Sequence, residues 1–225
     1  MAFRLSFAFV FISVNSLAQF AKIQDKDGYV NIRKQADIKS EVIGKFTEED
    51  IFWCLWPEGE WYQTDFKDGS GYIHKSRVKF ISDFLPIPKT KIQSNNIIFQ
   101  KDSIKVEIRI KPFKEIENKI ELRMRGDQKD VLKINGGETW GNFGTMPHTE
   151  YQFVQYSFGK NGRSLPKESI FNLYNPDLER TNVYFSEINN TIYITAINSD
   201  GAGAYALVWI IKKGGYLKRE LAVPF

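Results

Sequence analysis

Residues 61–76, with the sequence WYQTDFKDGSGYIHKS, decide the fold of the N-terminal part of this chain. Two β-prone runs, 61–66 and 71–74, flank the dipeptide Asp68-Gly69. An aspartate–glycine pair between such runs is a strong hairpin signal, because the favoured two-residue turn needs positive φ angles that these residues tolerate. The stretch therefore predicts a β-hairpin.

Three further short apolar runs precede this hairpin, and turn-prone residues separate them. They cover residues 29–33, 42–46 and 51–56. Five short strands between residues 22 and 82, with no amphipathic helix among them, are typical of a small closed barrel. We therefore predict that residues 19–82 form an SH3-like β-barrel domain.

The order of these runs resembles the bacterial SH3-like (SH3b) family over roughly residues 23–82. The matching stretches are YVNIR at 29–33, SEVIG at 40–44, EWY at 60–62 and GSGYIHKS at 69–76. The resemblance implies a module that binds peptide or peptidoglycan stems in a shallow groove between loops. Two loops depart from the family pattern, with KQAD at 34–37 and Glu49-Asp50 before the third run. Because such loops commonly shape ligand contacts, the resemblance does not identify the ligand.

Aromatic side chains provide the candidate binding residues of this module. Aromatic rings bury large areas at a small cost in conformational entropy, which suits recognition. The predicted ligand-binding set is Tyr29, Trp56, Trp61 and Tyr72. In the alternative interpretation, Trp53 and Trp61 fill the small core and Tyr72 covers one open end, because a barrel of this size needs large side chains. Trp56, beside Pro57, is expected to be exposed.

The first 18 residues have the pattern of a secretory signal peptide. Arg4 precedes an apolar run over residues 5–14, and Ser16-Leu17-Ala18 places small residues before a cleavage site at Gln19. The run is shorter than the roughly 20 apolar residues of a membrane-spanning helix. We therefore expect export to the periplasm or the extracellular space, with no membrane span after cleavage.

The rest of the chain predicts a linker over residues 83–95 and a second antiparallel β-rich domain over residues 96–225. Pro86 and Pro88 stiffen the linker and cannot donate to a strand ladder. Apolar residues alternate with charged ones over 104–111, which indicates a strand with one solvated face. Further strands are predicted at 120–125, 151–158, 183–188, 191–197, 204–212 and 216–223. The unbroken apolar run 206–211 is expected at the domain centre.

One short helix and one glycine-rich loop are also expected in this second domain. Pro166 suits the first turn of a helix over 167–174, and Asn175-Pro176 would end it. The loop holds Asp200, Gly201 and Gly203, which could present backbone N–H groups to an anion. The alternative is a tight turn that only glycine permits. Residues 199–205 and the following VWII run resemble C-terminal regions of uncharacterised exported bacterial proteins, which implies no activity.

The residue types and their spacing predict no catalytic site. The chain has one cysteine, Cys54, and two histidines, His74 and His148, with neither the spacing of a metal site nor that of a cysteine–histidine pair. The net charge of +4 is small and scattered, which argues against nucleic acid as a partner. We therefore expect no cofactor, no metal and no enzymatic activity.

Two functions remain as hypotheses. The first is an exported, non-enzymatic binding protein whose SH3b module engages cell-wall peptide or an envelope protein. The second is a periplasmic or secreted inhibitor or immunity-like protein that acts through the C-terminal β domain.

Overall fold

The computed structural model of the chain describes residues 19–67 and 69–224. The predicted signal peptide, residues 1–18, lies outside the described residues. The described part is built almost entirely from antiparallel strands, and its only helical elements are five three-residue 3₁₀ turns. The prediction of a mainly β protein is therefore confirmed. In the described part, no helix is long and apolar enough to cross a membrane.

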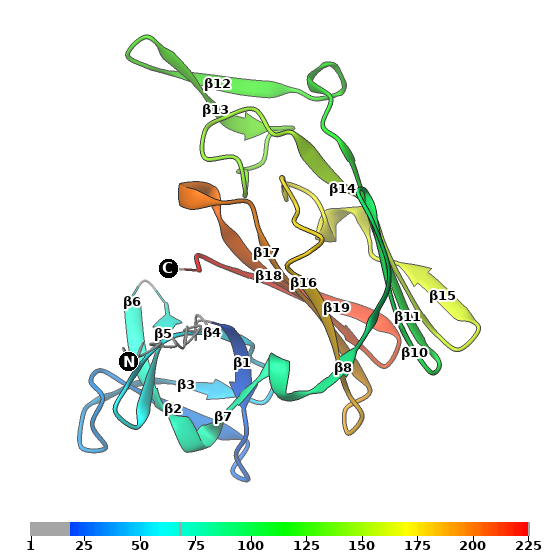
Figure 1. Cartoon of the computed structure of the whole chain (residues 1–225). Helices are drawn as coiled ribbons and strands as arrows, with labels where there is room; N and C mark the ends of the chain where they lie inside the picture. Colours follow the sequence, from blue (N-terminus) through cyan, green and yellow to red (C-terminus); the bar gives the residue numbers. More distant parts are fainter. Residues whose placement is uncertain (1–18, 68, 225) are drawn as a thin grey trace, which may run out of the picture.

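Seven strands form one sheet, which we call the N-terminal sheet (Figure 1). In spatial order they are β3 (Val42–Thr47), β2 (Tyr29–Arg33), β6 (Gly69–His74), β5 (Trp61–Phe66), β4 (Phe52–Glu58), β1 (Gln19–Ile23) and β7 (Val78–Phe80). Strands β5 and β6 pair from Trp61 opposite His74 to Phe66 opposite Gly69, so the predicted hairpin forms. Gly69 is the first residue of β6 and is not part of the turn, contrary to the prediction that Asp68-Gly69 makes it.

The predicted closure of this sheet into a barrel is not found. Among the described residues, no pairing joins the edge strands β3 and β7. The added strand β1 lies between β4 and β7, and β7 has only three residues. The sheet therefore remains open at both edges, although it encloses its own core. The members of that core are Ala21, Ile23, Val30, Ile32, Phe52, Cys54 and Ile73.

The C-terminal half contains two five-stranded sheets. The central sheet has the order β19 (Gly215–Ala222), β18 (Tyr205–Lys212), β17 (Thr191–Asn198), β16 (Thr181–Ser186) and β8 (Leu85–Ile87). The distal sheet has the order β15 (Asn161–Ser164), β14 (Thr149–Phe158), β11 (Ile104–Pro112), β10 (Asn96–Lys101) and β9 (Lys89–Gln93). A separate hairpin joins β12 (Ile120–Arg125) to β13 (Gln128–Ile134) and extends away from both sheets (Figure 1).

Residues 83–95, expected to be a linker, contribute two strands to the C-terminal half. Strand β8 pairs with β16 at the edge of the central sheet, and β9 pairs with β10 in the distal sheet. Pro86 is tolerated because β8 is an edge strand, where one side needs no ladder bonds. The chain passes from one sheet to the other at Pro88, so this segment ties the two sheets together.

The two sheets of the C-terminal half pack face to face. Alternate residues of β11, including Val106 and Ile108, are fully buried, which confirms the one-faced strand predicted at 104–111. They meet Ile192, Ile194 and Trp209 of the central sheet in the largest core cluster. Alternation of buried and solvated side chains is the usual pattern of a strand in a β-sandwich.

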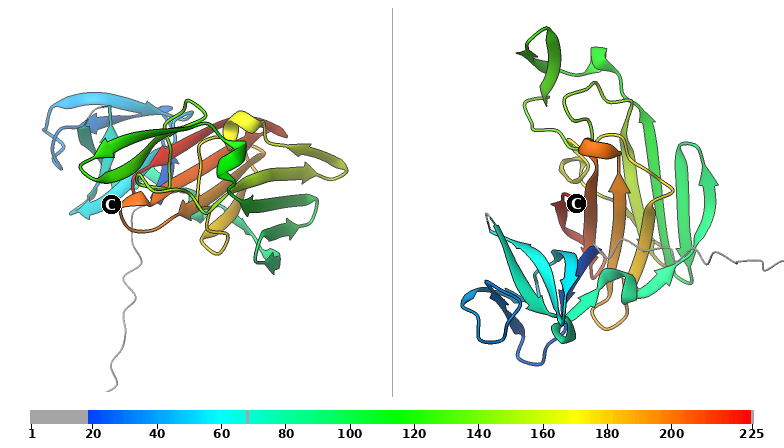
Figure 2. Two further views of the ribbon diagram at one scale, coloured as in Figure 1. Left: turned by 90° about the horizontal axis from the view of Figure 1, so that it is seen from above. Right: turned by 60° about the vertical axis from the view of Figure 1, so that its left-hand side comes forward.

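The other face of the central sheet is also covered, because the N-terminal sheet packs on it (Figures 1 and 2). Phe20 and Trp53 of the N-terminal sheet share a core cluster with Tyr193, Val208 and Ile210 of the central sheet. Seven of the eight residues of β18 are buried. Because β18 is buried on both faces, its residues 206–211 are all apolar. The N-terminal, central and distal sheets thus form three layers, with the central sheet in the middle.

The helix predicted over 167–174 is not formed. Only Lys167–Ser169 makes a 3₁₀ turn, and the chain then continues into bridges in which Leu173 pairs with Trp140 and Tyr174 with Glu150. The Ser169 carbonyl accepts hydrogen bonds from Trp209 Nε1 at 2.8 Å and from the Arg219 guanidinium at 2.9 Å. These tertiary bonds use the carbonyl that a continuing helix would have needed for its own ladder.

Candidate functional site

A hollow of about 330 Å³ lies on the exposed face of the N-terminal sheet, opposite its core. We call it the aromatic hollow. Its lining includes Tyr29, Arg33, Trp61, His74 and Arg77. Two of the four predicted binding residues, Tyr29 and Trp61, are therefore brought together here.

Strand alternation places these side chains on one face. Val30 and Ile32 of β2 point into the core, so Tyr29 and Arg33 point the opposite way. On β6, Ile73 is in the core and His74 is on the exposed face. Trp61 pairs with His74 across β5 and β6, and the two rings meet edge to face at 5.1 Å. The neighbouring strands thus hold the rings in fixed positions.

Charged groups of both signs surround these rings. The Arg33 guanidinium donates to the Ser40 carbonyl at 2.7 Å, which ties it to the loop before β3. Arg77 forms an ion pair with Asp25. A hydrogen bond from the Asp27 amide, with help from Arg77, lowers the pKa of Asp25, so this carboxylate stays charged at the rim. The hollow therefore offers aromatic surface together with fixed cationic and anionic groups.

His74 has a defined hydrogen-bonding role in this site. Its Nδ1 accepts the backbone N–H of Ser76 at 3.3 Å and lies 2.8 Å from the Ser76 hydroxyl. Because Nδ1 is an acceptor, the neutral ring carries its hydrogen on Nε2. His74 thereby fixes the 3₁₀ turn Lys75–Arg77, which places Arg77 at the rim.

The other two predicted binding residues do not line the aromatic hollow. Trp56 is 53% exposed and lies next to an irregularity in the pairing of β4 with β5. Tyr72 lies beside Glu58, and the hydrogen bond to this carboxylate raises the pKa of the Tyr72 hydroxyl. Trp53 and Trp61 are both buried, as the alternative interpretation expected, at 4% and 8% exposure. Trp53 packs against the central sheet and Trp61 against His74, outside the core cluster of the N-terminal sheet.

Sequence reasoning missed the charged residues of the hollow. Arg33 could have been found, because the alternation in YVNIR places it on the same face as Tyr29. Arg77 and Asp25 could not, because they are 52 positions apart in the sequence and meet only through the pairing of β1 with β7.

The glycine-rich loop borders a second, wider hollow of about 740 Å³ in the C-terminal half, together with His148, Asp177 and Arg180. Arg180 Nε donates to Asp177 at 2.6 Å, and its other nitrogen bonds the Ser199 carbonyl. Burial opposes ionisation of Asp177, but the hydrogen bonds from Arg180 outweigh it and lower its pKa. Asp200 lies at the edge of this hollow.

The loop itself has the geometry of a tight turn. Gly201 has a φ of +48°, which favours glycine, and residues 201–203 form a 3₁₀ turn. The N–H groups of Gly203 and Ala204 donate at 3.1 Å to carbonyls within the loop. These two donors are therefore already used, which favours the turn interpretation over an anion-binding one.

Cys54 and His74 do not form a reactive pair. Cys54 lies in the core of the N-terminal sheet, whereas His74 is on its exposed face. Burial raises the pKa of the Cys54 thiol strongly, which disfavours the nucleophilic thiolate. Within the described residues, no group of three or more His, Cys, Asp or Glu side chains is arranged to hold a metal ion.

This burial gives a testable expectation for the thiol. Because only an exposed thiolate attacks a disulfide reagent, Cys54 should react with Ellman's reagent on the order of a hundredfold more slowly in the folded protein than in guanidinium chloride. The absorbance of the released thiolate measures both rates. Equal rates would contradict the buried position of Cys54.

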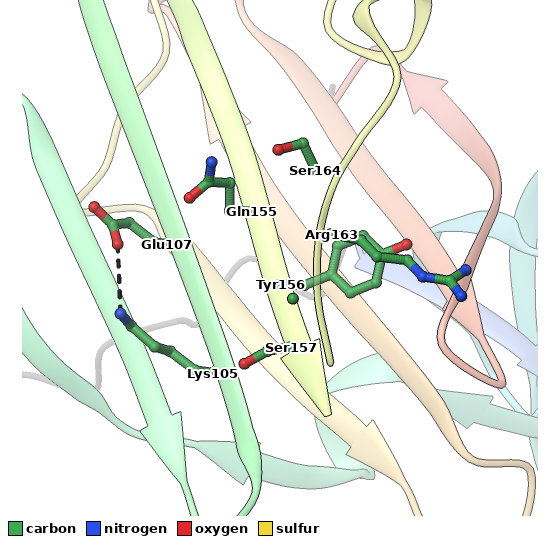
Figure 3. A pocket seen from close by; sticks show the side chains of 8 residues that line it. Lys105, Glu107, Gln155, Tyr156, Ser157, Arg163 and Ser164 are labelled. Carbon is green, nitrogen blue, oxygen red and sulfur yellow. Dashed lines mark ion pairs between the residues drawn. The ribbon is translucent and has the colours of Figure 1, made fainter. Parts of the chain in front are cut away.

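A third hollow, of about 370 Å³, lies on the solvated face of the distal sheet (Figure 3). Lys105 and Glu107 form an ion pair at 3.5 Å there, and Glu107 also contacts Arg109 at 3.5 Å. Tyr156 belongs to the sandwich core and is buried, so the hollow offers no exposed aromatic ring of its own. Arg163 adds a further positive charge to its lining. Because this third hollow lacks an exposed ring, the aromatic hollow remains the better candidate site.

Comparison with known proteins assigns neither a family nor a function to this chain. No protein family, no curated protein and no solved structure gives a significant match to this chain. The functional argument therefore depends on the geometry of the aromatic hollow.

Proposed function

We propose that the protein is an exported, non-enzymatic binding protein whose N-terminal, SH3b-like module binds cell-wall peptide at the envelope. The observation that carries this proposal is the aromatic hollow, whose lining combines Tyr29 and Trp61 with Arg33 and Arg77. It supports binding because the hollow combines an exposed aromatic ring with charged side chains on one face of the module.

The chemistry of the hollow suits a short peptide stem. Such stems carry free carboxylates, free amino groups and small apolar side chains. The Arg33 and Arg77 guanidinium groups can bind carboxylates, and Asp27, which is exposed in the lining, can accept from an amino group. The Tyr29 ring, which is 41% exposed, can cover the apolar parts of the ligand, whereas Trp61 is only 8% exposed and supports the floor of the hollow.

The remainder of the structure supports this role by holding the module in place. Phe20 and Trp53 anchor the N-terminal sheet on the central sheet through the face of β1 and β4. The aromatic hollow is formed mainly from β2, β5 and β6, so docking leaves it open to solvent. A rigid support lowers the entropy cost of binding, because little of the site must become ordered.

Binding to purified peptidoglycan sacculi tests the proposal. For residues 19–225, we expect retention on sacculi to weaken about tenfold or more when Tyr29 is changed to alanine, as for other exposed aromatic anchors. Tyr29 is 41% exposed, so this change spares the core. The matched control is Trp56→Ala, which removes another exposed ring outside the hollow. The fraction that sediments with sacculi at increasing concentrations measures the affinity.

Two results would contradict the proposal. If wild-type protein does not sediment with sacculi, the ligand class is wrong. If Trp56→Ala weakens retention as much as Tyr29→Ala does, the hollow is not the binding surface. Export is tested separately, since N-terminal sequencing of protein from the periplasm or medium should begin at Gln19.

One observation favours the inhibitor-like alternative. The hairpin β12–β13 extends from the sandwich and exposes Leu122 and Met124 on one strand. A protruding hairpin with apolar side chains can enter a groove of another protein or extend its sheet. If binding to the envelope fraction survives Tyr29→Ala but is lost on Leu122→Asp, the function belongs to this hairpin.

A further inference from the structure

A fourth hollow, of about 250 Å³, lies where the N-terminal sheet meets the central sheet. We call it the junction cleft. One wall comes from β1 and from the turn before β4, and the other from β17, β18 and β19. It shares no lining residue with the aromatic hollow, so it is independent of the site proposed above.

The floor of the junction cleft is apolar and rigid. Ile51, Tyr193 and Ile210 line it and also belong to the core between the two sheets or pack against it. Tyr193 pairs with Ile210 across β17 and β18, and its ring stacks on Phe84 with the ring centres 5.3 Å apart. The cleft is therefore an open end of a packed core, which can take up an apolar group without rearrangement.

Ammonium groups line the rim above this floor. Lys22 projects from the N-terminal sheet, and Lys212 and Lys218 project from the central sheet. Lys218 forms an ion pair with Glu220 at 2.9 Å. Among residues 19–67 and 69–224, no carboxylate lies within 4.0 Å of the Lys22 or Lys212 ammonium. Two of the three rim cations thus lack an ion-pair partner within the described structure.

Lys22 is in an unfavourable environment for a charged amine. It is half-buried, and this burial is the largest cause of its lowered pKa, to which the nearby Lys212 and Lys79 also contribute. Glu48 opposes the shift without reversing it. An anion bound between Lys22 and Lys212 would relieve both the desolvation and the repulsion.

The acidic residues of the cleft limit the charge of its ligand. Glu48 and Glu49 are exposed in the turn before β4 and lie on the same wall as Lys22. They would repel a second negative charge that extended toward this turn. The cleft therefore suits a ligand with one anionic group at one end and an apolar body.

We propose that the junction cleft binds a small monoanionic amphiphile, with its carboxylate between Lys22 and Lys212 and its apolar chain on Ile51, Tyr193 and Ile210. The carboxylate gains charge-assisted hydrogen bonds from two ammonium groups. The chain extends the core between the two sheets. Binding therefore also stabilises the contact between the N-terminal and C-terminal halves.

Isothermal titration of residues 19–225 with octanoate tests this proposal. We expect saturable one-site binding, weakened about tenfold or more in the variant Lys22→Gln/Lys212→Gln, because this variant loses both charge-assisted hydrogen bonds to the carboxylate. The neutral analogue 1-octanol should bind about tenfold more weakly than octanoate to the wild type. The matched control, Lys91→Gln/Lys101→Gln, removes two lysines of the distal sheet and should bind octanoate normally.

Two results would overturn the proposal: no saturable octanoate binding to the wild type, or equal affinity in wild type and Lys22→Gln/Lys212→Gln. If the double variant does not fold, as judged by circular dichroism, Leu217→Asp replaces it. Leu217 lines the cleft and is exposed, so an added carboxylate there should repel octanoate while preserving the fold. Unchanged affinity in Leu217→Asp would then refute the site.

Discussion

Replacing Trp209 with alanine is expected to lower the free energy of unfolding by about 3–5 kcal/mol, the range found for large aromatic side chains removed from protein cores. Trp209 is 0% exposed in the sandwich core, and its ring meets that of Tyr151 edge to face at 5.1 Å. Its indole N–H also donates to the Ser169 carbonyl, which helps to hold the irregular segment after β15. Urea unfolding followed by circular dichroism measures the loss.

A companion variant separates the packing contribution of Trp209 from its hydrogen bond, and a second variant serves as an exposed control. Trp209→Phe keeps most of the apolar volume but removes the N–H, and the Ser169 carbonyl still accepts from Arg219. We expect this change to cost about 1–2 kcal/mol, less than the alanine variant. Trp56→Ala, at an exposed position, should change the stability by less than about 0.5 kcal/mol. Similar losses for Trp209→Ala and Trp56→Ala would contradict the three-layer packing.

Changing Val208 to aspartate is expected to separate the two halves of the protein. Val208 is 0% exposed on the face of β18 that packs against Phe20 and Trp53. A carboxylate there would be buried among apolar side chains without a partner, which destabilises by about 4 kcal/mol or more. The sandwich core lies on the opposite face of the central sheet, so it should be less affected.

Hydrogen exchange measured strand by strand checks this second expectation. Amides of β1 and β4 should exchange faster in Val208→Asp than in the wild type, whereas amides of β11 and β14 should keep more of their protection. The matched control is Val223→Asp, at an exposed valine near the end of the chain. Uniform loss of protection in all strands would show that the two halves do not unfold separately.

Much of the secondary structure follows from local pattern. The alternation over 104–111 predicts β11, and Asp68-Gly69 predicts the pairing of β5 with β6. The continuous apolar run 206–211 predicts a strand at the domain centre, and β18 is buried on both faces. These signals depend on the side chains of a single strand or hairpin, so they can be recognised without any knowledge of distant partners.

Other features depend on contacts between segments far apart in the chain. Residues 85–87 contain a proline and flank a second one, yet they form β8 because the distant strand β16 provides a pairing partner. The expected helix at 167–174 is replaced by an irregular segment because Trp209 and Arg219 bind the Ser169 carbonyl. In both cases a tertiary hydrogen bond outweighs a local preference worth less than about 1 kcal/mol per residue.

The candidate sites also combine features that local sequence predicts with features that depend on tertiary contacts. The pattern YVNIR is enough to place Tyr29 and Arg33 on one face of a strand, since side chains alternate along an extended backbone. Whether Trp61 joins them, and whether Trp56 and Tyr72 do, depends on sheet order and on the irregular pairing of β4 with β5. The junction cleft exists only because two sheets dock, and the positions of Lys22 and Lys212 on opposite walls follow from that docking. Local sequence acts over a few residues, whereas burial and charge at these sites arise from surfaces that distant strands bring together.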